Sequence, residues 1–238
     1  MKTLIITDMH GEDPSGLVEK EEKVSGINKA VFLGDYDTPD ILRNLRNLKI
    51  KKKFIIGNHD LHYVYGLGII GSTMKYSWEE YASLWNRNPK EKDFIEKAII
   101  KTRRNSGLIL EDKLESGEKI VYCHGGIVDS GSPDSDAPGY VWQRMYSKEN
   151  ALMNFLRMRE KDYWTIFRGH DHSSFVIDFK EKLKKIEKCF KNKITLAKNN
   201  LHIVNVGAFF NGDYALFDED ARILKFKNTG YGYRLRGI

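Results

Sequence analysis

The chain has 238 residues, of which 41% are hydrophobic and 30% are charged, and its 39 basic and 33 acidic residues give a net charge of +6. This composition indicates a globular protein and argues against a membrane protein, because no apolar run approaches the roughly 18 residues of a membrane span. Two cysteines are too few for a disulfide framework.

Location and charge lead to two further expectations. The apolar start of the chain is too short for a signal peptide and runs directly into acidic residues, so we expect a cytoplasmic protein. Reduced thiols at Cys123 and Cys189 agree with that compartment. The positive charge favours an anionic partner such as nucleic acid, although lysines that merely solvate the surface explain it better.

Short apolar runs recur along the chain, and each ends abruptly in polar residues and glycine. Runs of this length that are rich in Val and Ile are typical of strands buried on both faces. Strands are therefore predicted at KTLIIT (2–7), AVFLG (30–34), KFIIG (53–57), KIVYC (119–123), WTIFRG (164–169) and LHIVNV (201–206).

Helical spacing appears between several of these strands. Residues 39–49 place Ile41, Leu45 and Leu48 on one stripe, and Ser147 is a suitable N-cap for a helix that follows it. Helices are predicted at 39–49, 77–86, 92–104 and 147–160. Strands that alternate with helices predict an α/β fold with a largely parallel sheet, and such sheets bind ligands beyond the carboxyl ends of the strands.

Two segments interrupt this alternation. Residues 62–118 look mostly helical and form either a cap beside the site or a plain helical layer on the sheet. Residues 179–193 carry an apolar stripe under a lysine-rich face, made of Phe179, Leu183, Ile186 and Phe190. This second segment is predicted to be an amphipathic helix or a hairpin, and its lysines could bind anions or a partner.

Chemically capable residues gather at the predicted strand ends. They are Asp8, His10, Asp35, Asn58, His59, His124, His170 and His172. Five histidines at strand ends are too many to be explained as buried, hydrogen-bonded core residues. Clustered imidazoles with carboxylates instead make metal sites. A mixed nitrogen and oxygen set with one carboxylate able to bridge suits two divalent ions about 3.5–4 Å apart.

The ordered motifs DMH, GD, GNHD, HGG and GHDH, across residues 8–172, resemble those of the calcineurin-like metallophosphoesterase superfamily. Each motif alone is weak, but all five in order form a strong signal. The resemblance extends to VNVGAF, which looks like the following strand of the family. It implies a single domain over residues 1–238, folded as a four-layer α-β-β-α sandwich with the metals at the carboxyl ends of the strands.

The resemblance also implies roles for these residues. One ion would be held by Asp8, His10, Asp35 and His172, and the second by Asp35, Asn58, His124 and His170, with Asp35 as the bridge. The ions would be Mn²⁺, or alternatively Fe²⁺, Zn²⁺, Co²⁺ or Ni²⁺. A metal-bridging hydroxide would attack phosphorus, while His59 would act as general acid or stabilise the leaving group. Asp35, Asn58 and His59 are thus the expected catalytic residues, and Asn58 and His59 would also contact substrate.

The chain departs from the protein-phosphatase branch of this family. That branch has a second aspartate that orients the catalytic histidine, but Thr38 stands at its position in GDYDTPD, so Asp37 or Asp60 could substitute. An ordinary protein Ser/Thr phosphatase is therefore not expected. Arg144 in YVWQRM echoes that branch and either grips a substrate phosphate or belongs to an ordinary helix or loop.

The leading hypothesis is a metal-dependent phosphatase that hydrolyses a phosphomonoester or phosphoanhydride. Its substrate would be a phosphorylated small molecule, a nucleotide or a phosphoprotein. A phosphodiesterase acting on nucleic acid or cyclic nucleotides is the close alternative, favoured by the basic balance. A binding scaffold without catalysis would show replaced ligands, but every expected position is filled. A single structural zinc site would have four closed ligands, commonly including thiolates, whereas the eight residues at the strand ends include no paired cysteines.

Overall fold

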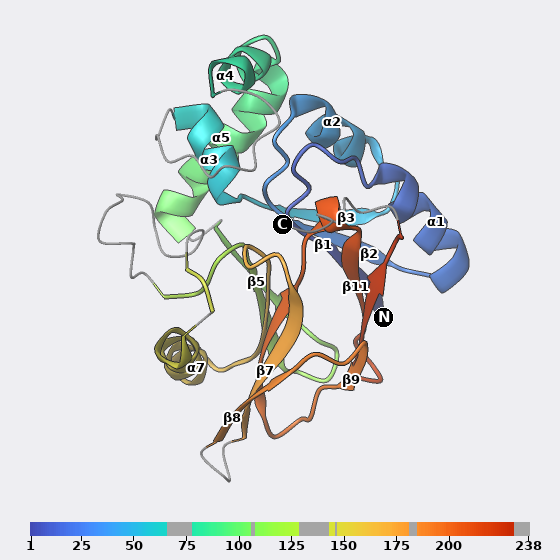
Figure 1. Cartoon of the computed structure of the whole chain (residues 1–238), viewed down its shortest axis with the longest axis vertical. Helices are drawn as coiled ribbons and strands as arrows, with labels where there is room; N and C mark the ends of the chain where they lie inside the picture. Colours follow the sequence, from blue (N-terminus) through green and yellow to red (C-terminus); the bar gives the residue numbers. More distant parts are fainter. Residues whose placement is uncertain (66–77, 106–107, 129–142, 146, 181–184, 231–238) are drawn as a thin grey trace, which may run out of the picture.

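Two six-stranded sheets form the centre of the molecule (Figure 1). The computed structural model describes residues 1–65, 78–105, 108–128, 143–145, 147–180 and 185–230. The first sheet runs β3 (Lys51–Ile55), β2 (Lys29–Leu33), β1 (Lys2–Ile6), β11 (Asp213–Asp218), β12 (Ile223–Asn228) and β9 (Lys193–Thr195). The second runs β4 (Ile109–Lys113), β5 (Lys119–Cys123), β6 (Tyr163–Arg168), β10 (Leu201–Val206), β7 (Ser174–Lys180) and β8 (Lys185–Cys189).

Each sheet combines three parallel strands with three antiparallel ones; the parallel group forms one edge of the first sheet and the centre of the second. Strands β1, β2 and β3 pair in parallel, as do β5, β6 and β10. All six strands predicted from the apolar runs are present, and they are these six parallel strands. The strands of each parallel group end at a common edge, so the polar motifs that follow β1, β2 and β3, and those that follow β5 and β6, are brought together.

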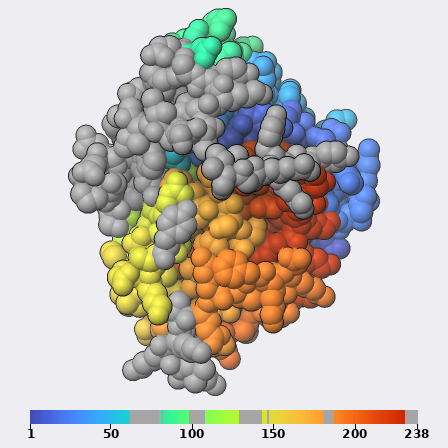
Figure 2. Space-filling model, in the orientation of Figure 1, coloured from blue at the N-terminus to red at the C-terminus, as the bar shows by residue number. Residues whose placement is uncertain are grey.

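Helices cover the outer faces of both sheets (Figure 1). On the side of the first sheet lie α1 (Ser15–Ser25), α2 (Pro39–Asn47), α3 (Asn58–Tyr65), α4 (Trp78–Asn86) and α5 (Pro89–Asn105), whereas α7 (Lys148–Lys161) lies beside the second. In the space-filling view the N-terminal elements (blue) adjoin the C-terminal strands (red), as the pairing of β1 with β11 requires (Figure 2). No helix among the described residues is both long and apolar enough to cross a membrane.

Three buried apolar clusters fill the interfaces between the layers. Along β1, Leu4 and Ile6 belong to the cluster shared with the first helical layer, whereas Ile5 belongs to the cluster between the sheets. The third cluster joins β5 and β6 to Phe155 and Met158 of α7. Successive residues of a strand point to opposite faces. The fold is therefore the predicted four-layer α-β-β-α sandwich.

The predicted helices are confirmed with small shifts at their ends. In α2, the stripe formed by Ile41, Leu45 and Leu48 packs into the first cluster, as its spacing predicts. At the start of α7, the backbone N–H of Asn150 donates to Oγ of Ser147 at 3.1 Å, so the predicted N-cap is formed. Elements that the sequence did not indicate are α1, β4, β9, β11 and β12.

The two irregular segments have different outcomes. Within 62–118, α4 and α5 pack Trp85 and Ile95 into the first apolar cluster, and the segment ends in the unexpected strand β4. Residues 66–77 and 106–107 lie outside the described chain, and the role of this segment as a cap stays a prediction. Within 179–193, β7 and β8 pair antiparallel, so the segment is a hairpin and not a helix; Leu183 lies outside the described residues.

Candidate metal centre

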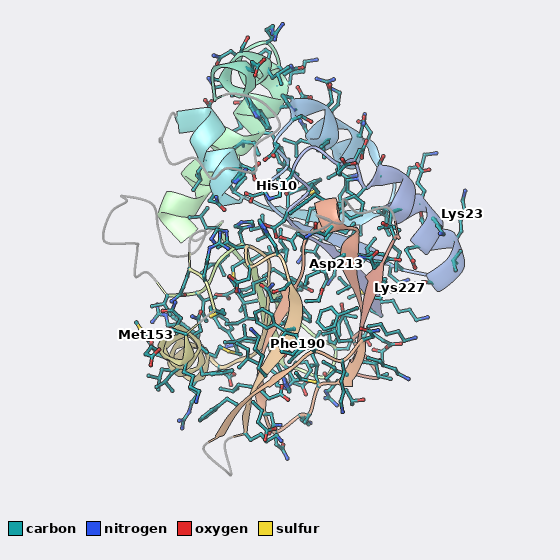
Figure 3. All side chains as sticks on the ribbon, in the orientation of Figure 1. His10, Lys23, Met153, Phe190, Asp213 and Lys227 are labelled. Atoms are coloured by element: carbon teal, nitrogen blue, oxygen red, sulfur yellow. The ribbon has the colours of Figure 1, made fainter. Side chains whose placement is uncertain are left out.

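The predicted site residues follow directly on the parallel strands. Asp8 and His10 come after β1, Asp35 after β2, and Asn58 and His59 begin α3 after β3. From the second sheet, His124 follows β5, and His170 and His172 follow β6. His10 lies at the upper end of the strands, on the side of α3 (Figure 3). Residues from both sheets thus meet at one rim.

The backbone of this rim is bent sharply. Six residues have left-handed backbone conformations: Asp8 (φ 51°), His10 (φ 45°), Asp35 (φ 58°), Asp37 (φ 62°), His170 (φ 67°) and His172 (φ 54°). Only two other non-glycine residues in the described chain, Asp162 and Arg222, do this. Such conformations cost energy and concentrate at functional sites. The tight turns let the chain present several polar side chains just beyond each strand.

Glycines in the motifs allow the turns to touch one another. A Cβ atom on Gly57 would lie 2.0 Å from Oδ1 of Asp35, and one on Gly169 would lie 1.8 Å from Oγ1 of Thr7. No side chain fits at either position without moving a neighbour. The glycines of GNHD and GHDH are therefore required for the close approach of the first sheet's loops to each other and to the second sheet's loop.

Five ligand atoms from both sheets cluster at metal-binding distances. Oδ1 of Asp8 lies 3.2 Å from Nε2 of His172, 3.8 Å from Nε2 of His124 and 3.9 Å from Nε2 of His10. Oδ2 of Asp35 lies 3.3 Å from Nε2 of His124 and 3.7 Å from Nε2 of His10. Two ligand atoms that share an ion at about 2.1 Å lie roughly 3–4 Å apart, so these spacings suit divalent cations.

Two of these atoms lack a hydrogen bond. Oδ1 of Asp8 and Nε2 of His10 are buried, and neither atom makes a hydrogen bond among the described residues. A buried polar atom without a partner is costly, and a cation would satisfy both. Three overlapping groups could each hold an ion: Asp8, His10 and His172; Asp8, Asp35 and His124; and His10, Asp35 and His59. The donor set therefore fits divalent metal ions.

Asn58 and His170 lie beside this cluster. Oδ1 of Asn58 is 2.9 Å from Nε2 of His124, which agrees with their expected place at a common ion. The ring of His170 lies 5.2 Å from the ring of His124, and its backbone N–H donates to Oδ2 of Asp8 at 2.9 Å. His170 belongs to none of the three groups found among the described residues. Its role as a ligand stays a prediction.

Asp37 connects two histidines. Its Oδ1 lies 3.1 Å from Nδ1 of His59, and its Oδ2 lies 3.3 Å from Nδ1 of His10. The indole N–H of Trp85 donates to the backbone carbonyl of Asp37 at 3.1 Å. Asp60 instead accepts backbone N–H groups of neighbouring residues. Of the two candidates for the orienting aspartate, Asp37 is thus the one in contact with His59.

The charges of the cluster support each other. Burial opposes ionisation of Asp8 and Asp35, but the surrounding imidazoles together outweigh it and hold both carboxyl pKa values below their ordinary value; His124 acts on both, with His172 beside Asp8, and His59 and His10 beside Asp35. Burial likewise opposes protonation of His59, yet the charges of Asp35 and Asp37 raise its pKa to about 10. The same balance, with Asp35 and Asp8, raises the pKa of His124 to about 9. The metal-free site therefore keeps protons on imidazoles that a metal would displace.

The side chain of Arg144 contacts the site at the backbone of His170. Its Nη1 donates to the carbonyl oxygen of His170 at 2.8 Å, and its side chain is 41% exposed. Contact with a substrate phosphate stays a prediction.

Sequence reasoning missed a buried network behind the second half of the site. Arg168, Asp171 and Asn205 are buried and hydrogen-bonded together. Arg168 stands immediately before GHDH, at the end of an apolar strand where a charge is unexpected. That unusual position was the one available signal, but its partners are distant in the sequence.

The comparisons with known proteins agree with this geometry. The profile of the calcineurin-like phosphoesterase superfamily domain matches residues 1–211, and the chain belongs to this superfamily. The general activity that goes with this family is metal-dependent hydrolysis of phosphate esters. No curated protein sequence matches the chain.

Solved structures share the fold at low sequence identity. A metallophosphoesterase from Sphaerobacter thermophilus is 21% identical, with 96% of this chain and 87% of that chain covered and a TM-score of 0.63. Vps29 from Chaetomium thermophilum is 15% identical, with 92% and 80% covered and a TM-score of 0.44. The first of these likenesses supports the fold.

Proposed function

We propose that this protein is a phosphatase that hydrolyses a phosphomonoester or phosphoanhydride with the help of two divalent metal ions, preferably Mn²⁺. The observation that carries the proposal is the pair formed by His59 and Asp37 at the edge of the metal-ligand cluster. A protonated imidazole beside the cluster can deliver a proton to a departing oxygen, which a monoester with a poor leaving group needs.

The chain's own residues divide the work between them. Asp8, His10, Asp35 and His172 would hold one ion, and Asp35, Asn58, His124 and His170 the other. When bound, two such ions supply positive charge that activates water and stabilises the transferred phosphoryl group. Asp35 is central because Oδ2 lies near two imidazoles while Oδ1 accepts the backbone N–H of His59 at 3.0 Å.

His59 would hold the proton for the leaving group. Its Nδ1 lies 3.1 Å from Oδ1 of Asp37, and Nε2 is the nitrogen to which we assign the contact with substrate. Two carboxylates raise its pKa to about 10 in the metal-free protein, although burial acts in the opposite direction. Bound cations repel the proton, so they move this pKa back toward working pH and make His59 a better acid.

Arg144 would bind the phosphoryl oxygens. A guanidinium offers parallel N–H donors to a tetrahedral anion, and 41% of the Arg144 side chain is exposed. The helices of residues 62–118 would act as a cap that selects the substrate. Trp85 of α4 supports this idea, since it touches the carbonyl of Asp37.

The test is hydrolysis of p-nitrophenyl phosphate and bis-p-nitrophenyl phosphate side by side. Protein stripped of metal is resupplied with Mn²⁺, Zn²⁺, Ni²⁺ or Mg²⁺. We expect metal-dependent turnover that is faster for the monoester and strongest with Mn²⁺. Preference for the diester would favour a phosphodiesterase. The net charge of +6 would suit a nucleic-acid substrate for such an enzyme. Metal binding without turnover of either ester would contradict the proposal.

A further inference from the structure

Arg168 is a fully buried charge behind the second sheet's part of the site. It is the last residue of β6 and its side chain is 0% exposed. Its guanidinium donates to the carbonyl oxygens of Gly125 and Gln143 and to the side-chain oxygens of Asp171 and Asn205. These acceptors come from four separate segments of the chain, so a single side chain ties them together.

Each of these segments adjoins a predicted site residue. Gly125 directly follows His124, and Gln143 directly precedes Arg144. Asp171 stands between the two histidines of GHDH, and the amide of Asn205 donates to the carbonyl of Ser173 at 2.6 Å. The network therefore fixes the backbone beside His124, beside Arg144 and around the GHDH turn.

Asp171 holds Arg144 from the other side. Its Oδ2 accepts both Arg168 and the backbone N–H of Met145, the latter at 3.0 Å. Its Oδ1 is buried without a hydrogen bond among the described residues and lies 3.9 Å from Nη1 of Arg144. The residues before and after Arg144 are thus both bound to the Arg168–Asp171 pair, and the Arg144 guanidinium is attracted to the same carboxylate.

The backbone and side chain of Gln143, next to Arg144, are tightly packed. Oε1 of Gln143 accepts the amide of Asn154 at 2.9 Å, and Oδ1 of Asn154 accepts the backbone N–H of Ile127, also at 2.9 Å. A Cβ atom on Gly126 would lie only 2.1 Å from Oε1 of Gln143. Because only arginine presents donors in a planar fork, lysine could not reach all of these acceptors at once.

We propose that Arg168, with Asp171 as its counter-ion, is a positioning residue that holds Arg144 in the pose that binds the phosphoryl group of the substrate. Arg168 is fully buried, so it acts on phosphate binding through Arg144. This inference rests on the proposed function, since it assigns a phosphate to Arg144.

The experiment compares Arg168→Lys and Asp171→Asn with a matched control pair. Arg222 donates to Glu118 at 2.5 Å, and Glu118 precedes β5, at the opposite end of that strand from His124. Arg222→Lys and Glu118→Gln are therefore the controls. After circular dichroism and melting confirm the fold, kcat and KM for p-nitrophenyl phosphate are measured in Mn²⁺-loaded protein. Titration calorimetry gives the Kd of inorganic phosphate.

We expect Arg168→Lys and Asp171→Asn to raise KM and the phosphate Kd about 10-fold while kcat changes much less, because ground-state phosphate binding is what is lost. The control variants should keep wild-type values. In a background of Arg144→Ala, adding Arg168→Lys should leave the phosphate Kd where Arg144→Ala alone puts it, since the two residues act on one contact.

Equal weakening of phosphate binding with and without Arg144, or unchanged binding in a folded Arg168→Lys variant, would overturn the inference. Loss of the fold in both variants would do so too, because the pair would then stabilise the whole domain. If the wild-type protein hydrolyses no phosphoester, the proposed function fails, while phosphate binding still decides the positioning role. A wild-type protein that binds no phosphate would refute both.

Discussion

The two sheets contribute to the site in different ways. On the first sheet, the loops are held by side chains inside the motifs themselves. Asp60 accepts the backbone N–H of Gly57 and of Asp35, both at 2.8 Å, and Asp35 accepts that of His59 at 3.0 Å. On the second sheet, the loops that carry His124, Arg144 and His170 are held by Arg168, which precedes GHDH, paired with Asp171 of that motif.

This contrast separates two ways of building a rigid site. A carboxylate such as Asp35 both faces the metal cluster and accepts a backbone N–H, so its replacement should affect loop structure and metal binding together. A buried ion pair away from the metal separates these tasks, so a change there should affect substrate binding more than metal binding. Variants in the two halves should therefore fail in different ways.

The largest effect is expected for Asp35→Asn, in the first half. The amide removes the charge near the imidazoles of His10 and His124, so both ions should be lost or weakened. Turnover should fall by about 1000-fold or more, as expected when a metal-based mechanism is disabled. Metal content by plasma mass spectrometry and kcat on the preferred ester check this. A fully active Asp35→Asn protein would refute the role of Asp35 as a bridge.

His59→Ala should remove chemistry while sparing the metal. Loss of the general acid should lower kcat about 100- to 10,000-fold, with metal content near that of the wild-type protein. An ester with a good leaving group, such as p-nitrophenyl phosphate, should suffer least, because it needs the proton least. Comparison with phenyl phosphate measures this difference. Loss of metal from the variant would mean that His59 is a ligand.

Asp37→Asn should weaken the orientation and the basicity of His59. Carboxylates, Asp37 among them, raise the pKa of His59. Removing one carboxylate lowers that pKa, so the proton is lost at lower pH and the basic limb of the kcat profile should move to lower pH. We expect roughly a 10-fold loss of kcat at neutral pH. An unchanged profile in an Asp37→Asn protein that retains metal would rule out this pairing.

The metal-free protein should lose stability at alkaline pH, which is an effect separate from those on turnover. The pKa of His124 is raised to about 9 and that of His59 to about 10, so their contribution to stability is fully present below about pH 6.5 and is lost as pH rises through 9 to 10. The free energy of unfolding should therefore fall between pH 7 and 10, by on the order of 3 kcal/mol per histidine at most.

Urea unfolding in the presence of EDTA measures this decline in the free energy of unfolding.

Two further pKa shifts shape the acid side of the stability curve. The lowered pKa values of Asp8 and Asp35 mean that their stabilisation is present above about pH 4 and is lost in acid. Saturating Mn²⁺ should remove the part of the alkaline decline that comes from His124, because a bound ion displaces its proton, and should move the part that comes from His59 to lower pH. A metal-free protein with constant stability from pH 7 to 10 would contradict these charges.

Much of the fold and site was readable from the sequence because the signals are local. The apolar runs ending at Thr7, Gly34 and Gly57 mark buried parallel strands, and the polar residues behind them mark the rim. The choice of Asp37 over Asp60 was not readable, because both stand close to the motifs and only the bent backbone decides which one faces His59. Strand β4 was also missed, since ILEDK is short and half polar.

The Arg168 network could not be predicted for a different reason. Its partners at Gly125, Gln143 and Asn205 are scattered along the chain, and nothing in their local sequence joins them. A buried charge announces that a partner exists, but only tertiary packing says which one. The expected ligands were identified through motifs, whereas the residues proposed to position Arg144 required the structure.

The most direct test of the account is the stoichiometry of Mn²⁺ in the wild-type protein and in Asp35→Asn. Calorimetric titration of metal-stripped protein should give two ions per wild-type chain, with protons released as the imidazoles of the cluster are deprotonated. The Asp35→Asn protein should show weakened binding at both sites. Two ions bound equally well by both proteins, or none bound by the wild type, would contradict the central claim that Asp35 joins a two-metal site.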